Sequence, residues 1–236
     1  MTVLVIDIGG THVKVMSREH PDAVKIPSGP AMTPKAMVAA VRKVIKGWDF
    51  SVIAIGYPGP VSNGRPITDP HNLGPGWIGF DFAKAFHHPV KLVNDAAMQA
   101  LGSYEGGKML FLGLGTGLGT ALIIDGVLQP MEMAHMPYRK NRTYEDYIGE
   151  RGLKRLGKKR WRVHVNKITE QLKAALAADY VVLGGGNAKL LKELPEGARL
   201  GDNHNALFGG LRLWQDEERQ EEKKQGEKKR QDMVKS

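Results

Sequence analysis

Cysteine is absent from the 236 residues of this chain, which excludes disulfide bonds and any metal site built on thiolates. Aromatic residues make up only 7%, yet hydrophobic residues reach 42%, a composition typical of a soluble globular protein and not of a disordered one. No apolar run approaches the length of a membrane span, and the N-terminus lacks the basic start of a signal peptide. We therefore expect a cytoplasmic protein with no membrane partner.

Charge is unevenly distributed along the chain, whose net charge is +9. The last 22 residues carry seven acidic and seven basic side chains, which cancel. Residues 139–162 carry ten basic and three acidic side chains, a net of +7. A local basic segment of this kind favours an anionic partner. The alternative is a solvated helix face, the usual role of a run of charges.

The pattern of apolar residues predicts a mixed α/β protein. A helix is expected from Pro34, with Met37, Val38 and Val41 on its apolar face, and another from about Ala96 to Tyr104. A third helix is expected from Trp161 onward and a last one from Asn203 into the tail, while residues 62–77 read as a long surface loop. Strands are expected in 3–17, 51–61, 89–95 and 108–128, and a strand, turn and helix in 179–194.

Two stretches share one arrangement, in which a strand, a Gly/Thr turn and a second strand follow one another. They contain "DIGGT" and "GLGTGLGT", and their similarity suggests an internally duplicated architecture with one phosphate loop in each half. The predicted domains are 1–105 as an N-terminal α/β lobe, 106–214 as a C-terminal α/β lobe, and 215–236 as a charged, mobile tail.

Three glycine-rich turns each follow a predicted buried strand, and glycine lets the backbone approach an anion closely. A single turn of this kind can be no more than a tight connection, but three in one chain favour phosphate binding. None fits the dinucleotide G-x-G-x-x-G pattern or the Gly-Lys-Ser/Thr ending of a P-loop. The turns are Gly9-Gly10-Thr11, Gly115-Thr116-Gly117 and Gly184-Gly185-Gly186.

The Asn94-Asp95 pair stands between a predicted strand and a predicted helix, and two interpretations of Asp95 are open. Asp is a preferred N-cap residue, because its carboxylate accepts hydrogen bonds from unpaired backbone N–H groups. A carboxylate at the C-terminal end of a buried strand is also where open α/β sheets place groups that face a ligand. In that position it could accept a proton from a hydroxyl that attacks a phosphate.

Seven short motifs occur in the order found in the ROK family of sugar kinases, which this chain resembles from about residue 3 to residue 213. They are "DIGGTHVK", "GYPGPV", "NLGPGW", "VNDA", "LGTGLGTALIIDG", "EMAH" and "VVLGGGNA". The resemblance implies the duplicated actin/hexokinase-like (ribonuclease H-like) fold, with two lobes and a cleft. Within the family the chain is most similar to the polyphosphate/ATP glucokinases. That similarity implies transfer of a terminal phosphoryl group to the 6-hydroxyl of glucose or a related hexose, with Mg²⁺, from ATP, inorganic polyphosphate or both.

The resemblance also implies a role for each matched residue. Asp95 would be the general base, with Asn94, Glu132, His135 and Glu145 holding the sugar, although Ala134 replaces the glycine of the family's Glu-x-Gly-His motif. Taken alone, Glu-x-x-His is a common spacing and more often marks packed polar residues than a ligand site. The first phosphate loop would comprise Asp7, Gly9, Gly10, Thr11 and Lys14, with Mg²⁺ near Asp7 if held there. The second would comprise Gly115, Thr116 and Gly117, and Gly185, Gly186 and Asn187 would line the adenosine side if a nucleotide is used.

One departure from the family concerns the region after His135, where most members carry a cysteine-rich zinc knuckle. This chain has the basic segment there, so no structural zinc is expected. The segment can be a cationic track for a polyanionic phosphoryl donor or only a solvated helix face. Its candidate residues are Arg139, Lys140, Arg142, Lys154, Arg155, Lys158, Lys159, Arg160 and Arg162.

Two rival functions have different requirements. A sugar-sensing repressor of the same family would carry a DNA-binding helix-turn-helix before the first phosphate loop; here that loop begins at Asp7, so we do not expect a repressor. A decayed kinase fold that binds polyanions through residues 139–162 would not be expected to retain Asp95, Glu132 and His135. We expect a hexose-binding enzyme without a nucleic-acid partner, and the family leads us to expect a homodimer. The sequence leaves open which hexose is used and which donor is preferred.

Overall fold

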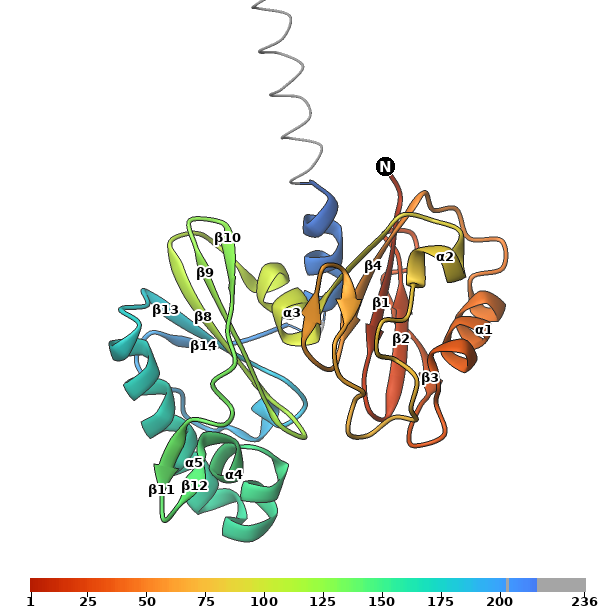
Figure 1. Cartoon of the computed structure of the whole chain (residues 1–236). Helices are drawn as coiled ribbons and strands as arrows, with labels where there is room; N and C mark the ends of the chain where they lie inside the picture. Colours follow the sequence, from red (N-terminus) through yellow and green to blue (C-terminus); the bar gives the residue numbers. More distant parts are fainter. Residues whose placement is uncertain (203, 216–236) are drawn as a thin grey trace, which may run out of the picture. The chain divides into compact units, whose positions relative to one another are not determined.

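The computed structural model describes residues 1–202 and 204–215, which form two compact units (Figure 1). Among the described residues, unit 1 comprises Met1–Val93 and residues 209–215, and unit 2 comprises Asn94–Phe208. Each unit has its own five-stranded sheet and its own hydrophobic core. The chain therefore passes between the units at 93/94 and at 208/209, so the helix after Asn94 groups with unit 2.

The sheet of unit 1 has the order β3-β2-β1-β4-β7. Strands β1, β2 and β3 form an antiparallel meander, and β4 pairs parallel to β1. Every residue of β1 and β4 is buried. The strands are β1 (Val3–Ile8), β2 (His12–Met16), β3 (Val24–Pro27), β4 (Val52–Tyr57) and β7 (Val90–Asn94), with a short pair β5 (Val61–Ser62) and β6 (Arg65–Pro66) and helices α1 (Pro34–Val44) and α2 (Phe82–Phe86).

The sheet of unit 2 has the order β10-β9-β8-β13-β14 and repeats the arrangement of unit 1. Strands β8, β9 and β10 form an antiparallel meander, and β13 pairs parallel to β8. The predicted duplication is therefore present in the topology. The strands are β8 (Lys108–Leu114), β9 (Leu118–Ile124), β10 (Val127–Pro130), β13 (Tyr180–Gly184) and β14 (Ala198–Leu200), with a hairpin β11 (Pro137–Arg139) and β12 (Arg142–Thr143). The helices are α3 (Asp95–Ser103), α4 (Tyr144–Ile148), α5 (Glu150–Ala175) and the 3₁₀ turn η1 (Ala188–Leu190).

The predicted helix at Pro34 is confirmed as α1. Thr33 caps it, because its hydroxyl accepts a hydrogen bond from the backbone N–H of Ala36, and Pro34 supplies the fixed φ that suits a first helical turn. Met37, Val38 and Val41 are buried as the spacing predicted. The apolar face predicted from Trp161 is likewise confirmed in α5, where Trp161, Val165, Ile168 and Leu172 are buried.

Two sequence predictions differ from the structure. The segment 62–77 is not wholly a surface loop, because Trp77 is fully buried in the core of unit 1. Its indole Nε1 donates to the carbonyl of Gly74 at 2.7 Å, and its backbone N–H donates to the Asp69 carboxylate at 2.8 Å. The helix expected after Asn187 is only the single turn η1, and the carbonyl of its last residue accepts a hydrogen bond from Arg162.

Residues 205–215 are helical, and residues 209–215 of this helix belong to unit 1. Gly210 allows this helix to lie against β1, because a Cβ there would overlap the side chain of Val5. Trp214 donates from its indole to the carbonyl of Ile53 at 3.2 Å, and Lys91 lies over the Trp214 ring at 4.7 Å. The predicted mobile tail, residues 216–236, lies outside the described residues. Within the described chain, no helix is long and apolar enough to cross a membrane.

Candidate functional site

The first glycine turn joins β1 to β2 in unit 1. Gly9 closes it by donating to the carbonyl of His12 at 3.0 Å, and a Cβ on Gly9 would lie only 2.9 Å from that oxygen. A Cβ on Gly10 would lie 3.0 Å from the side chain of Asn72, which belongs to the "NLGPGW" motif. Within residues 1–202 and 204–215, no hydrogen bond takes up the N–H of Gly10 or Thr11. Both N–H groups can therefore donate to an anion.

Asp7 and Lys14 face one another across β1 and β2, beside this turn. The Lys14 ammonium lies 3.0 Å from the Asp7 carboxylate; Asp7 is buried, while the lysine side chain is 43% exposed. The carboxylate therefore holds the ammonium at the turn and leaves part of it accessible to a phosphate. A Mg²⁺ ion bound directly to Asp7 would have to compete with that ammonium, so these residues fit a directly held Mg²⁺ poorly. Among the described residues there is no group of three or more His, Asp or Glu that could hold a metal ion.

Unit 2 carries the Asn94-Asp95 pair at the start of α3. Asn94, not Asp95, is the N-cap: its amide oxygen accepts from the N–H groups of Ala96 at 3.0 Å and Ala97 at 3.2 Å. Asp95 is the first helical residue, half-buried, and its Oδ1 accepts from the N–H of Ala96 at 2.8 Å. The interpretation of Asp95 as the N-cap is therefore wrong. The helix is capped without it, because asparagine is as good a cap as aspartate.

The first turn of α3 packs directly on β9. A Cβ on Gly119 would lie 2.6 Å from the Cβ of Ala96, so only glycine allows this approach. Asp95, next to Ala96, is thereby placed close to the start of β9, where the second glycine turn ends.

The second glycine turn, Gly115-Thr116-Gly117, joins β8 to β9. Gly115 donates to the carbonyl of Gly117 at 3.1 Å, and no hydrogen bond among the described residues takes up the N–H of Thr116 or Gly117. This turn thus offers two backbone donors, as the first turn does. Its predicted part in phosphate binding stays a prediction, with a geometry that suits an anion.

The third glycine turn supports the second one. Asn187 donates from its backbone N–H to the carbonyl of Leu114 at 2.9 Å and from its side-chain amide to the carbonyl of Gly115 at 3.1 Å. Gly185 has a φ of +82°, and a Cβ there would lie 2.5 Å from the Leu114 carbonyl oxygen. Gly185 and Asn187 therefore fix the backbone of the second turn, and their predicted place on the adenosine side stays a prediction.

The "EMAH" segment is attached to β9 by Thr120, a residue that sequence reasoning missed. The buried Thr120 hydroxyl donates to the carbonyl of Met131 at 3.1 Å and accepts from the N–H of Met133 at 3.2 Å. Glu132 lies between these two contacts, and its carboxylate accepts from the N–H of Ala134 at 3.1 Å. Glu132 and His135 are exposed, as a ligand-facing pair requires, whereas Ala134 is buried.

Glu145, in the first turn of α4, connects the "EMAH" segment to the second glycine turn. Its backbone N–H donates to the carbonyl of Ala134 at 3.0 Å, and its carboxylate accepts from the N–H of Leu118 at 3.1 Å. The structure therefore joins Glu145 to both elements within unit 2, and β9, which follows the glycine turn, packs against α3 at Gly119. Sequence reasoning found Glu145 but not its contact with the turn, because the two lie 27 residues apart.

The basic segment divides into residues engaged in packing and residues that face solvent. Arg155 lies over the Tyr147 ring and donates to the carbonyl of Asp146, and Arg162 donates to the carbonyl of Leu190. Gly157, with φ +69°, interrupts α5. Directly after this break, three consecutive basic residues open the second stretch of the helix and are exposed. They are Lys158, Lys159 and Arg160.

An aromatic cluster, defined here as Tyr138, Tyr144, Tyr147 and His164, packs the β11–β12 hairpin against α4 and α5. Tyr138 and His164 share a hydrogen bond at 3.1 Å between the phenol oxygen and Nδ1, and both Tyr138 and Tyr147 meet the imidazole edge to face. Burial lowers the pKa of His164 below its ordinary value, and the charges of Arg139, Arg155 and Lys167 act in the same direction. Sequence reasoning missed this cluster, because its members are up to 26 residues apart.

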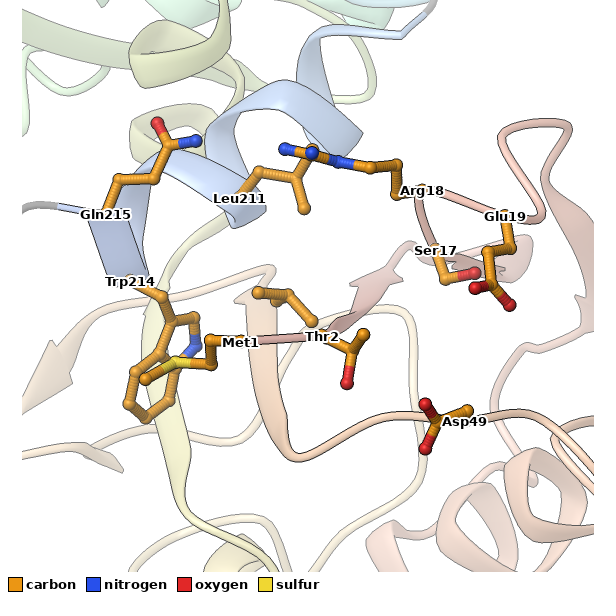
Figure 2. Close-up of a pocket in the computed structure, with 10 residues that line it drawn as sticks. Met1, Thr2, Ser17, Arg18, Glu19, Asp49, Leu211, Trp214 and Gln215 are labelled. Atoms are coloured by element: carbon orange, nitrogen blue, oxygen red, sulfur yellow. The ribbon is translucent and has the colours of Figure 1, made fainter. Parts of the chain in front are cut away.

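A cavity of about 300 Å³ lies in unit 1 at the N-terminal end of β1, whereas the first glycine turn follows the C-terminal end of that strand. Figure 2 shows that its walls come from β1, the residues after β2, the loop before β4 and the terminal helix. The cavity is lined by residues that include Arg18, Glu19, Asp49 and Trp214, and none of these four was predicted to be functional.

Comparison with known proteins gives a family and a fold. The sequence profile of the ROK family matches residues 3–138. A glucokinase of Pyrobaculum calidifontis is 28% identical over 129 residues, covering 52% of this chain and 43% of that protein. A polyphosphate glucokinase of Mycobacterium leprae is 25% identical over 202 residues, covering 77% of this chain and 62% of that protein. The chain thus spans about half the length of these curated relatives.

Among solved structures, a polyphosphate/ATP-glucomannokinase from Arthrobacter sp. strain KM superposes with a TM-score of 0.75 at 21% identity. The match covers 88% of this chain and 96% of that one. This likeness confirms the predicted actin/hexokinase-like fold with its duplicated α/β units.

Proposed function

This chain belongs to the ROK family, and on that basis we propose that it is a sugar kinase that phosphorylates the 6-hydroxyl of glucose or a related hexose. The observation that carries the proposal is the position of Asp95. Asn94 caps α3, so the helix does not depend on the aspartate, and the Ala96–Gly119 approach places Asp95 beside the strand that leaves the second glycine turn. Names of glucokinases and polyphosphate glucokinases among the relatives support the same activity.

Phosphoryl transfer asks a protein mainly for positioning and charge neutralisation. In the proposed reaction the Asp95 carboxylate accepts the proton of the sugar hydroxyl as its oxygen forms a bond to the terminal phosphorus. The bond from that phosphorus to the bridging oxygen of the donor breaks, and the shortened donor leaves with the electron pair. The products are the sugar 6-phosphate, the shortened donor and one proton.

The sugar is proposed to bind in unit 2 between α3 and the "EMAH" segment. Glu132 and His135 are exposed at a turn that Thr120 fixes to β9, so their backbone positions are well defined while their side chains face outward. Asn94 is proposed to contact a sugar hydroxyl through its side-chain amide, whose oxygen also caps α3. Glu145 would provide a further acceptor for sugar hydroxyls.

Each unit is proposed to offer phosphates the backbone donors of its own glycine turn, with the Lys14 ammonium beside the turn of unit 1. The N–H groups of Gly10 and Thr11 in one unit and of Thr116 and Gly117 in the other are the available donors. Mg²⁺, when bound with the phosphates of the donor, would neutralise part of their charge. We propose no direct protein ligand for it, because the Lys14 ammonium lies 3.0 Å from one oxygen of the Asp7 carboxylate and would repel a cation there.

Inorganic polyphosphate is proposed as a donor alongside ATP. Lys158, Lys159 and Arg160 are exposed at the start of the second stretch of α5, and the first turn of a helix adds partial positive charge from its unpaired N–H groups. Three cations at that end are unfavourable without an anion nearby, so the arrangement suits a chain of phosphates. ATP would instead place its adenosine near Gly185, Gly186 and Asn187.

The proposed function is tested by a coupled assay for sugar phosphates with the purified chain. A panel of glucose, mannose and N-acetylated hexosamines is assayed once with ATP and once with polyphosphate, both with Mg²⁺. We expect phosphorylation of at least one hexose at its 6-hydroxyl. Binding of a hexose without turnover by either donor would refute the kinase assignment and leave a sugar-sensing protein instead.

A further inference from the structure

A carboxylate of the chain itself already contacts the second glycine turn. The Glu145 carboxylate accepts the N–H of Leu118 at 3.1 Å, and a Cβ on Gly117 would overlap the same carboxylate oxygen. Gly117 is therefore glycine at least partly to admit Glu145, and not only to admit a phosphate. This contact had no part in the predicted functions of either residue.

The backbone around Glu145 is fixed on three sides. Its N–H donates to Ala134, its carbonyl accepts from Gly149 at 2.8 Å, and the N–H of Glu150 donates to the carbonyl of Thr116 at 3.2 Å. Because the backbone is held by these hydrogen bonds, a rearrangement of Glu145 would be a rotation of its side chain. It can move between the glycine turn and the solvent side of the "EMAH" segment, to which its own residue is bonded.

A phosphate that reached the N–H groups of Thr116 and Gly117 would lie next to this carboxylate. Two negative charges at such a distance repel each other, more strongly where water is partly excluded. The donor can use the turn fully only if the carboxylate leaves it. Sugar hydroxyls offer the carboxylate hydrogen-bond donors that replace the N–H of Leu118.

We infer that Glu145 makes binding of the phosphoryl donor depend on prior binding of the sugar. Without sugar, the carboxylate occupies the second glycine turn and repels the donor. With sugar, it turns to the hydroxyls and frees the turn. The inference rests on the proposed sugar-kinase function, and its consequence is that water alone is a poor acceptor for the donor phosphate.

The test measures binding of tripolyphosphate to the full chain by calorimetry, without and with saturating glucose. We expect glucose to tighten binding about tenfold in the original chain, the scale of one like-charge contact near a protein surface. Glu145→Gln keeps the shape and the acceptor for Leu118 but loses the charge. It should bind tripolyphosphate about tenfold more tightly than the original chain in the absence of glucose, with little further gain when glucose is added.

Two further variants make the result specific. Glu150→Gln removes a nearby carboxylate that pairs with Lys154, and it keeps the backbone N–H that donates to Thr116. This variant should therefore behave as the original chain. Gly117→Ala displaces the Glu145 carboxylate without removing it, and should lose the dependence on glucose as Glu145→Gln does. An equal response to glucose in Glu145→Gln and the original chain overturns the inference, as does an absence of tripolyphosphate binding in all variants. Loss of the glucose response in Glu145→Gln alone supports it even if turnover is never detected, so its failure and that of the kinase assignment are separable.

Discussion

Asn94 and Asp95 are adjacent residues for which we predict opposite effects of mutation. Asn94→Ala removes both cap hydrogen bonds, to Ala96 and Ala97, and should lower the free energy of unfolding by about 1–2 kcal/mol. Asp95→Asn retains an oxygen acceptor for the N–H of Ala96 and removes the negative charge at the helix start. Its cost should be about 0.3–1 kcal/mol, the size of an interaction with the helix dipole.

The effects on activity should be reversed. An amide cannot accept the proton of the attacking hydroxyl, so Asp95→Asn should lower kcat by about 100- to 10,000-fold, while hexose binding remains measurable by calorimetry. Asn94→Asp is the matched control for the cap, because aspartate caps a helix as well as asparagine does. It should keep the melting temperature and weaken hexose binding, because a carboxylate replaces the side-chain amide that we assign to the sugar.

The assays are urea unfolding and steady-state kinetics on the same preparations. For a chain of this size, each kcal/mol corresponds to a shift in melting temperature of about 2–4 °C, which scanning calorimetry resolves. If Asp95→Asn retained most of its turnover, the base assignment would be wrong. If it destabilised the chain as much as Asn94→Ala does, the assignment of the cap to Asn94 would fail.

Three other predictions concern the basic segment, the third glycine turn and the aromatic cluster. Replacing Lys158, Lys159 and Arg160 with Ala should raise the KM for long polyphosphate several-fold and leave the KM for ATP nearly unchanged; equal effects on both donors would remove the track. Gly185→Ala forces a side chain into the left-handed region and against a carbonyl of β8, so we expect a loss of at least about 1–2 kcal/mol in urea unfolding, and a neutral result would contradict the φ of +82°. His164 has a pKa below that of the unfolded chain, so the unfolded state binds the proton first, and stability should fall as the pH drops below about 6.5. His164→Gln should flatten that part of the stability profile, and an unchanged slope would show that another group is responsible.

Local signals predicted the elements well. Thr33, Pro34 and the spacing of Met37, Val38 and Val41 marked α1 correctly, because capping and apolar periodicity are properties of neighbouring residues. The repeated Gly/Thr turns led to the duplicated topology for the same reason. Each involves only a strand, a turn and the next strand, and such a hairpin is visible within a single window of sequence.

Long-range contacts could not be predicted. Nothing near Trp77 shows that it is buried, and nothing near Gly117 shows that it packs against a carboxylate 28 residues later in the chain. The sequence left open whether Asp95 caps the helix, because both residues of the pair are good caps; the backbone angles and the hydrogen bonds of Asn94 identify it as the cap. The predicted role of each site residue depended on the order of the motifs. That order implies a function for the matched residues, but it does not give the contacts between them.

The β11–β12 hairpin, between the "EMAH" segment and α4, is held by aromatic side chains and not by cysteine ligands of a metal ion. Tyr138, Tyr147 and His164 hold it through edge-to-face contacts and one hydrogen bond. This cluster contains no thiol for peroxide to oxidise and depends on no metal ion that a chelator could remove. Its weak point is acid, because a proton on the imidazole removes the acceptor that the Tyr138 hydroxyl can use and adds a cation beside Arg139 and Arg155. Oxidation or loss of metal would weaken a hairpin held by metal-bound thiolates, whereas we expect this hairpin to weaken at low pH.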